Sequence, residues 1–589
     1  MLQRHTKKEA LSGNRAAGLV PPMLGGDTEF ANFVLGATDP QGTGRIASRL
    51  LLDAIDGVRA FRSHRPMDTA PAGSNDRPSD NNATLSDASL QPLLGYDVQD
   101  WGRKFLPSTG GSAYVDLDHI EMPLPEVRSA GEFVAAWHGS IRIVLDAMRK
   151  VNRRLPEGMR LQVLANNSDG QGHSYGAHIN VLISRTTFNN LFHYRIHHLS
   201  YLASYQASSI IFTGQGKVGS ENNTPAVDFQ ISQRADFEET LCGIQTTYCR
   251  PVVNSRDEPL CGMRGRRGSD EAASTLARLH VIFYDANLCQ VACFLKVGVL
   301  QLILVLIAAK KINQDLLLEN PVVDVVRWSH DPSLAARAAT ISGRHVTALE
   351  LQLDFLTEAE AFHEQGGFDG LVPEVDEILR LWRSTLEALG KRDFDSLFGS
   401  IDWITKREFL KRAITTRPEL TWQSPEIKHL DHCYANIDPA EGLFWTCQDS
   451  PHAARIVSDA TIERFATQPP EDTRAWTRAM LLRLADPDQI DSIDWDRITF
   501  VTGSDWRGEF RQTLDMSNPL AMGRDEMGHF FDRGANLAET LAELPVREEI
   551  VYRGSNSYAR DAQPQDSSSD LHVSNDDLCL EGGPDDEIS

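Results

Sequence analysis

The sequence predicts an α+β fold, with a core built on a sheet and a smaller, mainly helical C-terminal region. The first observation is that strand-like and helix-like segments alternate between residues 111 and about 330. The second is that helical periodicity dominates after about residue 345. The third is size, because 589 residues of which 41% are hydrophobic can bury a large core and form more than one domain.

The elements follow in order along the chain. A first strand is expected at "GGDTEFANFVLG" (25–36), and a helix at "GRIASRLLLDAIDGVRAF" (44–61). A long helix is expected at 130–155, and later helices at 375–392 and 401–414. Short apolar or alternating runs predict the other strands, which are "AYVDL" (113–117), "LQVLAN" (161–166), "HINVLIS" (178–184), "SIIFTGQG" (209–216), "VDFQISQ" (227–233) and "LHVIFYDA" (279–286).

Composition divides the chain into four parts. Residues 1–20 are expected to be a flexible N-terminus, and 21–440 the larger, sheet-based domain. Within that domain, residues 62–93 are rich in Ser, Asp, Asn and Pro, which predicts a mobile polar loop. Residues 441–553 would form the smaller C-terminal domain, and 554–589 a disordered acidic tail.

The charge balance and the cysteines limit the class of protein. The formal net charge of -24 disfavours binding to nucleic acid or to anionic lipid. The eight cysteines show no CxxC pair, and no signal peptide precedes them, so we expect a cytoplasmic protein. The apolar run "VGVLQLILVLIAA" (297–309) is shorter than the roughly 20 residues of a membrane span, so it predicts a buried core helix.

Carboxylates form the first chemical signal. Asp27 and Glu29 alternate along the first strand and therefore project from one face. Asp116, Glu121 and Glu126 gather in "YVDLDHIEMPLPE". Oxygen ligands of this kind hold Mg²⁺, which usually bridges nucleotide phosphates. Each carboxylate taken alone is more typical of a solvated surface.

Imidazole, amide and guanidinium groups form the second signal. His178 and Asn180 share one face of a predicted strand, Arg234 and Arg256 stand beside strands, and His280 lies in "LHVIFYDAN". Guanidinium groups near Mg²⁺ would stabilise charge on a phosphoryl group. A structural histidine or a salt-bridged loop arginine is the usual role of each residue in isolation. The sequence GxxxxGK[ST] is absent, which excludes a P-loop.

The order of these segments resembles the Pup ligase and depupylase family, which comprises the ligase PafA and the deamidase Dop. "GGDTEF" is similar to the family's GxExE[FY] motif, and "YVDLDHIEMPLPE" to YVDxxHPEYxxPE. Further matches are "NNSDGQGHSYGAHIN", "FTGQGKVG", "ISQRADFEETLCGIQTTYCRPVVNSRDEP", "LHVIFYDANLCQVACFLKVG", "LDHCYANIDPAEGL" and "IDWDRITF".

The resemblance implies a glutamine-synthetase-like domain whose curved antiparallel sheet binds ATP and Mg²⁺. It places Asp116 at the catalytic aspartate. It also implies a metal set and a nucleotide- or substrate-binding set. The metal set is Asp27, Glu29, Glu121, Glu126 and His178, and the binding set is Arg234, Arg256, His280 and Asn180.

Two activities occur in the family. The ligase joins the C-terminal glutamate of the small ubiquitin-like modifier Pup to a target lysine, whereas the deamidase hydrolyses the C-terminal glutamine or the isopeptide bond of modified proteins. The spacing "DLDHIE" resembles the D-H-A-H-P-E pattern of Dop and is one residue shorter than the ligase pattern D-V-G-S-H-P-E. The polar loop at 62–93 also resembles one in Dop. Both features favour the deamidase, with Asp116 as nucleophile or as base for water.

Several positions depart from the family pattern, namely Asp27, Ile120, Met122, Ile179 and Leu260. Aspartate in place of glutamate shortens the reach of the first carboxylate by one methylene. Strand alternation would point Ile179 away from His178 and Asn180. These departures leave a third interpretation open, a divergent and catalytically weak protein that binds a modifier.

Overall fold

A computed structural model describes residues 19–38, 41–60, 101–258, 260, 276–448, 454–532 and 536–552. The predictions made for residues 1–18, for the polar loop at 62–93 and for the acidic tail at 554–589 lie outside these ranges.

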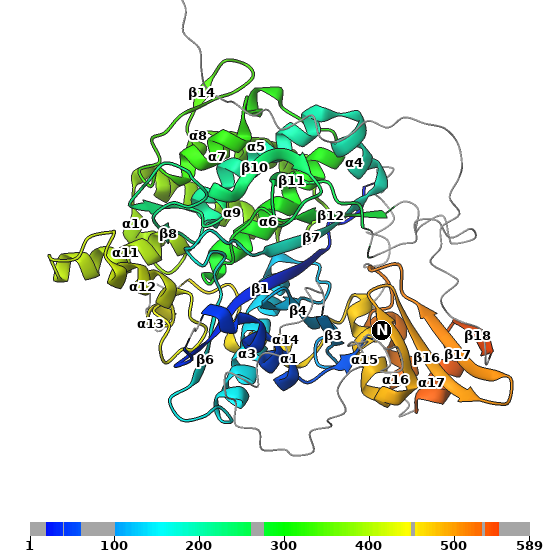
Figure 1. Cartoon of the computed structure of the whole chain (residues 1–589). Helices are drawn as coiled ribbons and strands as arrows, with labels where there is room; N and C mark the ends of the chain where they lie inside the picture. Colours follow the sequence, from blue (N-terminus) through cyan, green and yellow to red (C-terminus); the bar gives the residue numbers. More distant parts are fainter. Residues whose placement is uncertain are drawn as a thin grey trace, which may run out of the picture.

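An eight-stranded sheet organises the larger part of the protein (Figure 1). The strand order is β12-β7-β1-β5-β4-β3-β2, with β6 paired to the far half of β1. Every pairing in this sheet is antiparallel, as predicted. The strands are β1 (Leu24–Leu35), β2 (Val58–Arg59), β3 (Trp101–Phe105), β4 (Ser112–Asp116), β5 (His119–Pro123), β6 (Arg160–Leu164), β7 (Ala177–Ser184) and β12 (Leu276–Val281).

One face of this sheet is apolar and packs on helices. Phe30 of β1, Ile120 of β5 and Ile179 of β7 all belong to the main hydrophobic core. Helices α1 (Gly44–Ala54), α3 (Ala130–Asn152) and α6 (Gln290–Ala308) contact strands of the sheet. The residues between these apolar positions therefore project from the opposite face, which is where the charged residues lie.

Further helices and short strands complete the larger part. The helices are α4 (Arg185–Asn189), α5 (Ile196–Thr213), α7 (Pro321–Ser329), α8 (Ala348–Glu364), α9 (Val375–Lys391), α10 (Phe394–Leu397), α11 (Asp402–Thr416), α12 (Pro425–Tyr434), α13 (Trp445–Gln448) and α14 (Asp459–Thr467). A π-helical turn, η3 (Asn190–Tyr194), precedes α5, and the 3-10 turns are η1 (Gln41–Thr43), η4 (Ala235–Phe237) and η6 (Gln314–Leu316). The short strands pair as β8 (Lys217–Val218) with β9 (Phe229–Gln230), β10 (Glu238–Gly243) with β11 (Arg250–Asn254), and β13 (Ala338–Ala339) with β14 (His345–Val346).

The strand predicted at 209–216 is wrong, because the chain there forms the end of helix α5 and the loop after it. From Tyr201 to Thr213 every residue of α5 is buried. A helix buried on all sides shows no 3.6-residue hydrophobic pattern, so a run such as "SIIFT" cannot be distinguished from a buried strand by periodicity.

Among the described residues, helix α6 alone has the length and composition to cross a membrane. It is 19 residues long because it starts at Gln290, before the apolar run that the sequence showed. Within the protein, 94% of its apolar window is buried. This burial agrees with the predicted core helix.

The C-terminal region differs from the mainly helical one that was predicted. After α15 (Arg474–Leu484) and the 3-10 turn η7 (Pro487–Gln489), it forms a four-stranded antiparallel sheet covered by two short helices (Figure 1). Its own hydrophobic cluster runs from Trp476 to Leu544 and includes Val58 and Phe105 from the edge of the large sheet. The strands are β15 (Ile490–Asp494), β16 (Arg497–Ser504), β17 (Gly508–Asp515) and β18 (Val546–Tyr552), and the helices are α16 (Arg524–Phe531) and α17 (Leu537–Glu543).

A buried ion-pair cluster joins the two parts. Glu126, just after β5, accepts hydrogen bonds from Arg474 Nε at 2.6 Å and from Arg478, both in α15. Arg478 Nε also donates to the Gly110 carbonyl at 2.7 Å. Burial opposes the charge of Glu126, but the two arginines outweigh it and lower its pKa to about 2. Glu126 therefore anchors the C-terminal part, which is a correction to its predicted place in the metal set.

We expect Glu126→Gln to destabilise the protein by about 3–5 kcal/mol, because it leaves two buried guanidinium groups without a charged partner. Chemical denaturation at neutral pH measures this loss. Glu471→Gln is the matched control, since Glu471 and Arg524 form an ion pair in which both side chains are about half exposed, and its loss should cost less than about 1 kcal/mol. Equal stabilities of the two variants would contradict the anchoring role.

Candidate active site

Charged side chains from four adjacent strands meet on the face of the sheet opposite the helices. The register places Asp27 of β1 opposite His178 of β7, and Glu29 opposite Glu121 of β5. Residues directly opposite each other in an antiparallel pair project from the same face with Cβ atoms about 5 Å apart. The structure thus brings together the predicted residues Asp27, Glu29, Glu121, His178, Asn180 and His280.

At one end of this cluster, two imidazoles and an amide surround Asp27. Asn180 Nδ2 donates to Asp27 Oδ1 at 2.7 Å, and His178 Nδ1 lies 3.6 Å from Oδ2. His280 packs edge-on against His178 with ring centroids 5.0 Å apart. Burial opposes ionisation of Asp27, but the neighbouring His178 and the charge of Arg278 help to outweigh burial and lower its pKa. Asp27 is therefore a carboxylate at neutral pH.

Burial and the neighbouring charge of Arg278 lower the pKa of His280 well below its ordinary value. His280 is therefore a neutral imidazole that can offer a lone pair. Ligand atoms of Asp27, His178 and His280 lie within 4.8 Å of one another, the one such group among the described residues able to hold a metal ion.

At the other end, Glu29 is held on both oxygens. Gly176 N donates to Oε1 at 2.8 Å, and His119 Nδ1 lies 3.0 Å from Oε2. The ring of His119 also packs on Tyr175 at a centroid distance of 4.3 Å. Burial opposes the charge of Glu29, but His119, His178 and the Gly176 amide outweigh it and lower its pKa.

Glu121 lies opposite Glu29 on β5, and its pKa shows the electrostatic cost of holding these carboxyl groups together. Burial and the negative charges of Asp27, Glu29 and Asp116 raise its pKa well above the ordinary value. The neighbouring Tyr114 has a raised pKa as well, because of its burial and the charge of Glu121. Like charges within one buried site disfavour ionisation of one member.

Asp116 is the last residue of β4 and pairs across a two-residue turn with His119, the first residue of β5. The turn is Leu117 and Asp118, and Leu117 has a φ of 50°. A leucine in this left-handed region costs about 1–2 kcal/mol. The tight turn fixes Asp116 at the edge of the carboxylate cluster, close enough to influence Glu121.

Arg234 is buried near the cluster. Its Nη1 donates to the Tyr175 carbonyl at 2.5 Å and to Ser174 Oγ at 3.2 Å. Its Nε and Nη2 are buried and have no hydrogen-bond partner among the described residues. Two unsatisfied guanidinium nitrogens in a buried position suit an oxyanion.

Arg256 lies at the rim, where its side chain is 38% exposed and Nη1 is 3.8 Å from Glu258 Oε2. Its charge contributes to the lowered pKa of His280, so it remains in electrostatic range of the cluster.

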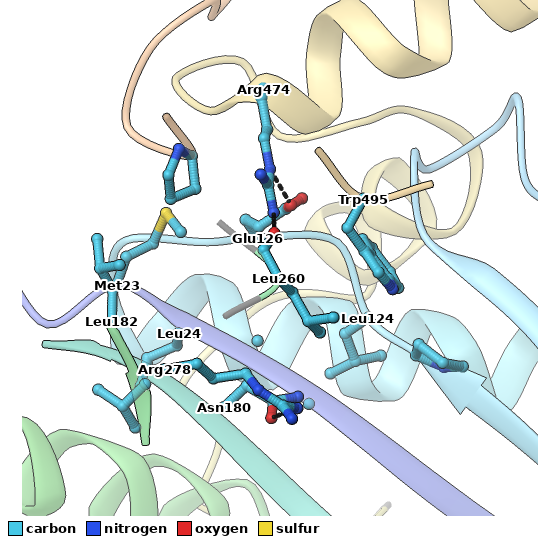
Figure 2. A pocket seen from close by; sticks show the side chains of 15 residues that line it. Met23, Leu24, Leu124, Glu126, Asn180, Leu182, Leu260, Arg278, Arg474 and Trp495 are labelled. Carbon is cyan, nitrogen blue, oxygen red and sulfur yellow. Dashed lines mark hydrogen bonds and ion pairs between the residues drawn. The ribbon is translucent and has the colours of Figure 1, made fainter. Parts of the chain in front are cut away.

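A pocket with about 510 Å³ of empty space, part of it open to solvent, lies between the end of the sheet and the C-terminal part (Figure 2). Its walls are mostly apolar and include Leu24, Leu124, Leu260 and Trp495. The polar groups that line it are Asn180, Arg278, Glu126 and Arg474. Arg278 Nη1 donates to Asn180 Oδ1 at 2.9 Å, so the cavity adjoins the Asp27 end of the cluster. Apolar walls with a few convergent polar groups are typical of a site for a flat organic ligand.

The donor set fits a divalent cation. Asp27 offers a carboxylate oxygen and His178 and His280 offer ring nitrogens to one group, and the carboxylates Glu29 and Glu121 lie opposite each other on the same face of the sheet. A cation among these groups would offset the repulsion that raises the pKa of Glu121. The adjoining cavity and the buried Arg234 would accommodate the base and the phosphates of a nucleotide.

Sequence reasoning missed four residues of the site. His119 binds Glu29, Tyr114 lies opposite Glu121, Tyr175 packs on His119, and Arg278 binds Asn180. Strand alternation would have found three of them, since His119 and Glu121, Tyr114 and Asp116, and Arg278 and His280 each stand two residues apart.

Most departures from the family pattern lie outside the charged face. Ile120, Met122 and Ile179 are all buried in the core on the helix side of the sheet. This confirms the expected orientation of Ile179. Leu260 contributes an apolar wall to the cavity, and its carbonyl accepts from Arg474 Nη2 at 2.7 Å.

Comparisons with known proteins match this fold and these motifs. The family model described as "Pup-ligase protein" matches residues 23–499. A depupylase of Acidothermus cellulolyticus is 31% identical over 439 residues, 74% of this chain and 82% of that protein. A Pup–protein ligase of Acidimicrobium ferrooxidans is 34% identical over 445 residues, which cover 74% of this chain and 91% of that protein. A Pup deamidase/depupylase of Mycolicibacterium smegmatis is 33% identical over 462 residues, which cover 78% of this chain and 87% of that protein.

Solved structures show the same fold. The complex between the modifier Pup and its ligase PafA superposes with a TM-score of 0.66 at 21% identity, covering 85% of this chain and 89% of that one. PafA in complex with ADP gives a TM-score of 0.63 at 22% identity, covering 82% of this chain and 100% of that one.

The raised pKa of Glu121 leads to a prediction about stability and pH. Below about pH 4.3, the ordinary pKa of a glutamate, the folded and unfolded chains both hold this proton. As the pH rises, the unfolded chain ionises first, so the wild type loses stability. Because glutamine cannot ionise, Glu121→Gln should be more stable than the wild type by about 1 kcal/mol or more at pH 8 in metal-free buffer.

Denaturation curves from pH 4 to pH 8 test this prediction, and the advantage of the variant should shrink toward pH 4. Glu157→Gln, at an exposed loop position, is the control and should follow the wild type at every pH. A constant difference between Glu121→Gln and the wild type would contradict the electrostatic origin.

Proposed function

The chain belongs to the Pup ligase and depupylase family, and from that premise we propose that it is an ATP- and Mg²⁺-dependent depupylase and deamidase. Its substrates would be the C-terminal glutamine of a small ubiquitin-like modifier and the isopeptide bond between that modifier and a target lysine. The observation that carries this proposal is the two-residue turn between Asp116 and His119.

The length of this turn supports the depupylase over the ligase. Asp116 and Glu121 are separated by four residues here, a spacing similar to the depupylase pattern and one residue shorter than the ligase pattern. In an antiparallel hairpin the loop length fixes the register, and each extra residue changes the direction in which the flanking side chains leave the turn. The position of Asp116 relative to Glu121 and Glu29 therefore follows from this spacing.

A nucleotide with Mg²⁺ would supply positive charge and a phosphate group beside the scissile carbonyl. Asp27, His178 and His280 would hold the metal, with Glu29 and Glu121 beside them. Arg234 would bind a phosphate or a substrate carboxylate through its Nε and Nη2. The cavity beside Asn180 and Arg278 would bind the base of the nucleotide. In support, a solved relative of the same fold binds ADP.

Asp116 would carry out the attack on the amide carbonyl, either as nucleophile or as base for a water molecule. Either role needs an ionised carboxylate, because only the carboxylate can attack the carbonyl carbon or accept a proton from water. His119, which pairs with Asp116 across the turn, also contacts Glu29 and so holds Glu29 in place near Asp116.

The decisive assay combines the protein with ATP and Mg²⁺, a Pup-like peptide that ends in glutamine, and a protein already conjugated to the modifier. We expect release of ammonia and of free target, and a loss of at least about 100-fold in Asp116→Asn, the size typical of a general base. Asp118→Asn is the control, because Asp118 is 54% exposed and pairs with Arg45 on the outer side of the same turn.

Conjugates formed from a glutamate-ended peptide would instead show a ligase, the activity of the Acidimicrobium relative. Modifier binding without turnover in either assay would show a protein that only binds.

The spacing itself is testable by insertion. A glycine placed between Leu117 and Asp118 lengthens the turn to three residues and moves Asp116 relative to Glu121. We expect hydrolysis to fall at least tenfold while the melting temperature changes little. The same insertion between Trp506 and Arg507, at the tip of the β16–β17 hairpin, should leave activity intact. Unchanged hydrolysis after the first insertion would remove the argument for the depupylase.

A further inference from the structure

A second cavity lies on the outside of the helical part, far along the chain from the candidate active site. It has a volume of about 620 Å³, part of it open to solvent, and lies between the end of α9, α10 and α11. Trp403, Arg407 and Lys411 come from one face of α11, because they are spaced four residues apart. Phe394 of α10 lies across from Trp403, with ring centroids 5.7 Å apart at 71°.

Two cations in this cavity lack partners. Arg407 Nε is buried without a hydrogen-bond partner, and neither Arg407 nor Lys411 makes an ion pair with any residue that the structure describes. Burial lowers the pKa of both side chains, and the charge of Arg407 lowers that of Lys411 further. Like charges at positions i and i+4 of a helix repel each other, and the negative charge of Glu408 offsets part of this repulsion.

Three acidic residues also line the cavity. Glu408 Oε1 accepts from Arg412 Nε at 3.2 Å, and its charge also acts on Arg407 and Lys411. Asp393 Oδ1 accepts from the backbone of Ser396 at 3.3 Å and so caps α10. Asp395 stands exposed in the first turn of α10. The carboxylates therefore balance the cations in number, but the buried Arg407 Nε keeps its hydrogen-bonding capacity for a ligand.

We propose that this cavity binds an oxyanion, a phosphate or a carboxylate, on a ligand whose apolar part packs against Phe394. Arg407 and Lys411 hold the oxyanion, since their charge-assisted hydrogen bonds satisfy nitrogens that the protein leaves unpartnered. Phe394 and Trp403 supply the apolar wall. The site is independent of the proposed function, because none of its lining residues belongs to the carboxylate cluster.

Helix α11 also reaches the loop that borders Arg234. Lys406, the neighbour of Arg407, points inward, and its Nζ donates to the Gly216 carbonyl at 2.6 Å. Gln233, which precedes Arg234, donates to the same carbonyl at 3.0 Å. The Gly216 carbonyl therefore links helix α11 to the residue that precedes Arg234.

Equilibrium dialysis of the full chain with phenyl phosphate and with phenylacetate tests the proposal. The double variant is Arg407→Ala/Lys411→Ala. For one or both of these anions, we expect the wild type to bind one equivalent more than the double variant does. If the double variant loses binding of phenyl phosphate alone, the natural ligand carries a phosphate. If it loses binding of phenylacetate alone, the natural ligand carries a carboxylate. Arg417→Ala, which removes an exposed cation at the end of the same helix, is the control and should bind as the wild type does.

Thermal unfolding guards against a folding defect. In anion-free buffer the double variant should melt at or above the wild-type temperature, because it loses two repelling charges. The bound anion should raise the melting temperature of the wild type more than that of the variant. Equal binding of both probes by the wild type and the double variant would overturn the proposal. A failure of this kind leaves the hydrolysis assays unaffected, so the two ideas are tested separately.

Discussion

The structure depends on one electrostatic constraint, the collection of four carboxyl groups on one face of a central sheet. Asp27, Glu29, Glu121 and Asp116 repel one another, and the raised pKa of Glu121 reports the cost of holding them together. Neighbouring groups offset part of this cost, since the Gly176 amide and His119 bind Glu29 and Asn180 binds Asp27. The apolar helix face supplies the burial that keeps the strands in register. Strain of this sort is typical of functional sites.

The C-terminal part is tied to the site through Glu126. Its ion pairs with Arg474 and Arg478 bring α15 against the end of the sheet, and Arg474 and Trp495 then close one side of the larger cavity. The cavity therefore needs both parts of the chain. A single buried carboxylate, which the sequence suggested as a metal ligand, instead sets the position of a second hydrophobic cluster.

The departures from the family pattern divide by face of the sheet. Ile120, Met122 and Ile179 belong to the apolar side, where volume and shape decide what is tolerated. Asp27 alone changes the charged side, and its shorter side chain is held by Asn180 and faces His178 and His280. The charged face thus keeps its carboxylates and imidazoles, which is why an active enzyme of the Pup system is favoured over a protein that only binds.

The sequence by itself predicted most strands of the large sheet and the burial of the apolar run at 297–309, and the family resemblance implied that the sheet is antiparallel. It also predicted most of the charged face, because a two-residue period places Asp27 with Glu29 and His178 with Asn180 on common faces. Tertiary structure alone decided the place of Glu126, since its partner Arg474 lies 348 residues away and two prolines end the alternation before it. It also decided that "SIIFT" is helical and that the C-terminal region contains a sheet. Local patterns specify which face a side chain takes, whereas partners distant in sequence are fixed only by the packing of whole elements.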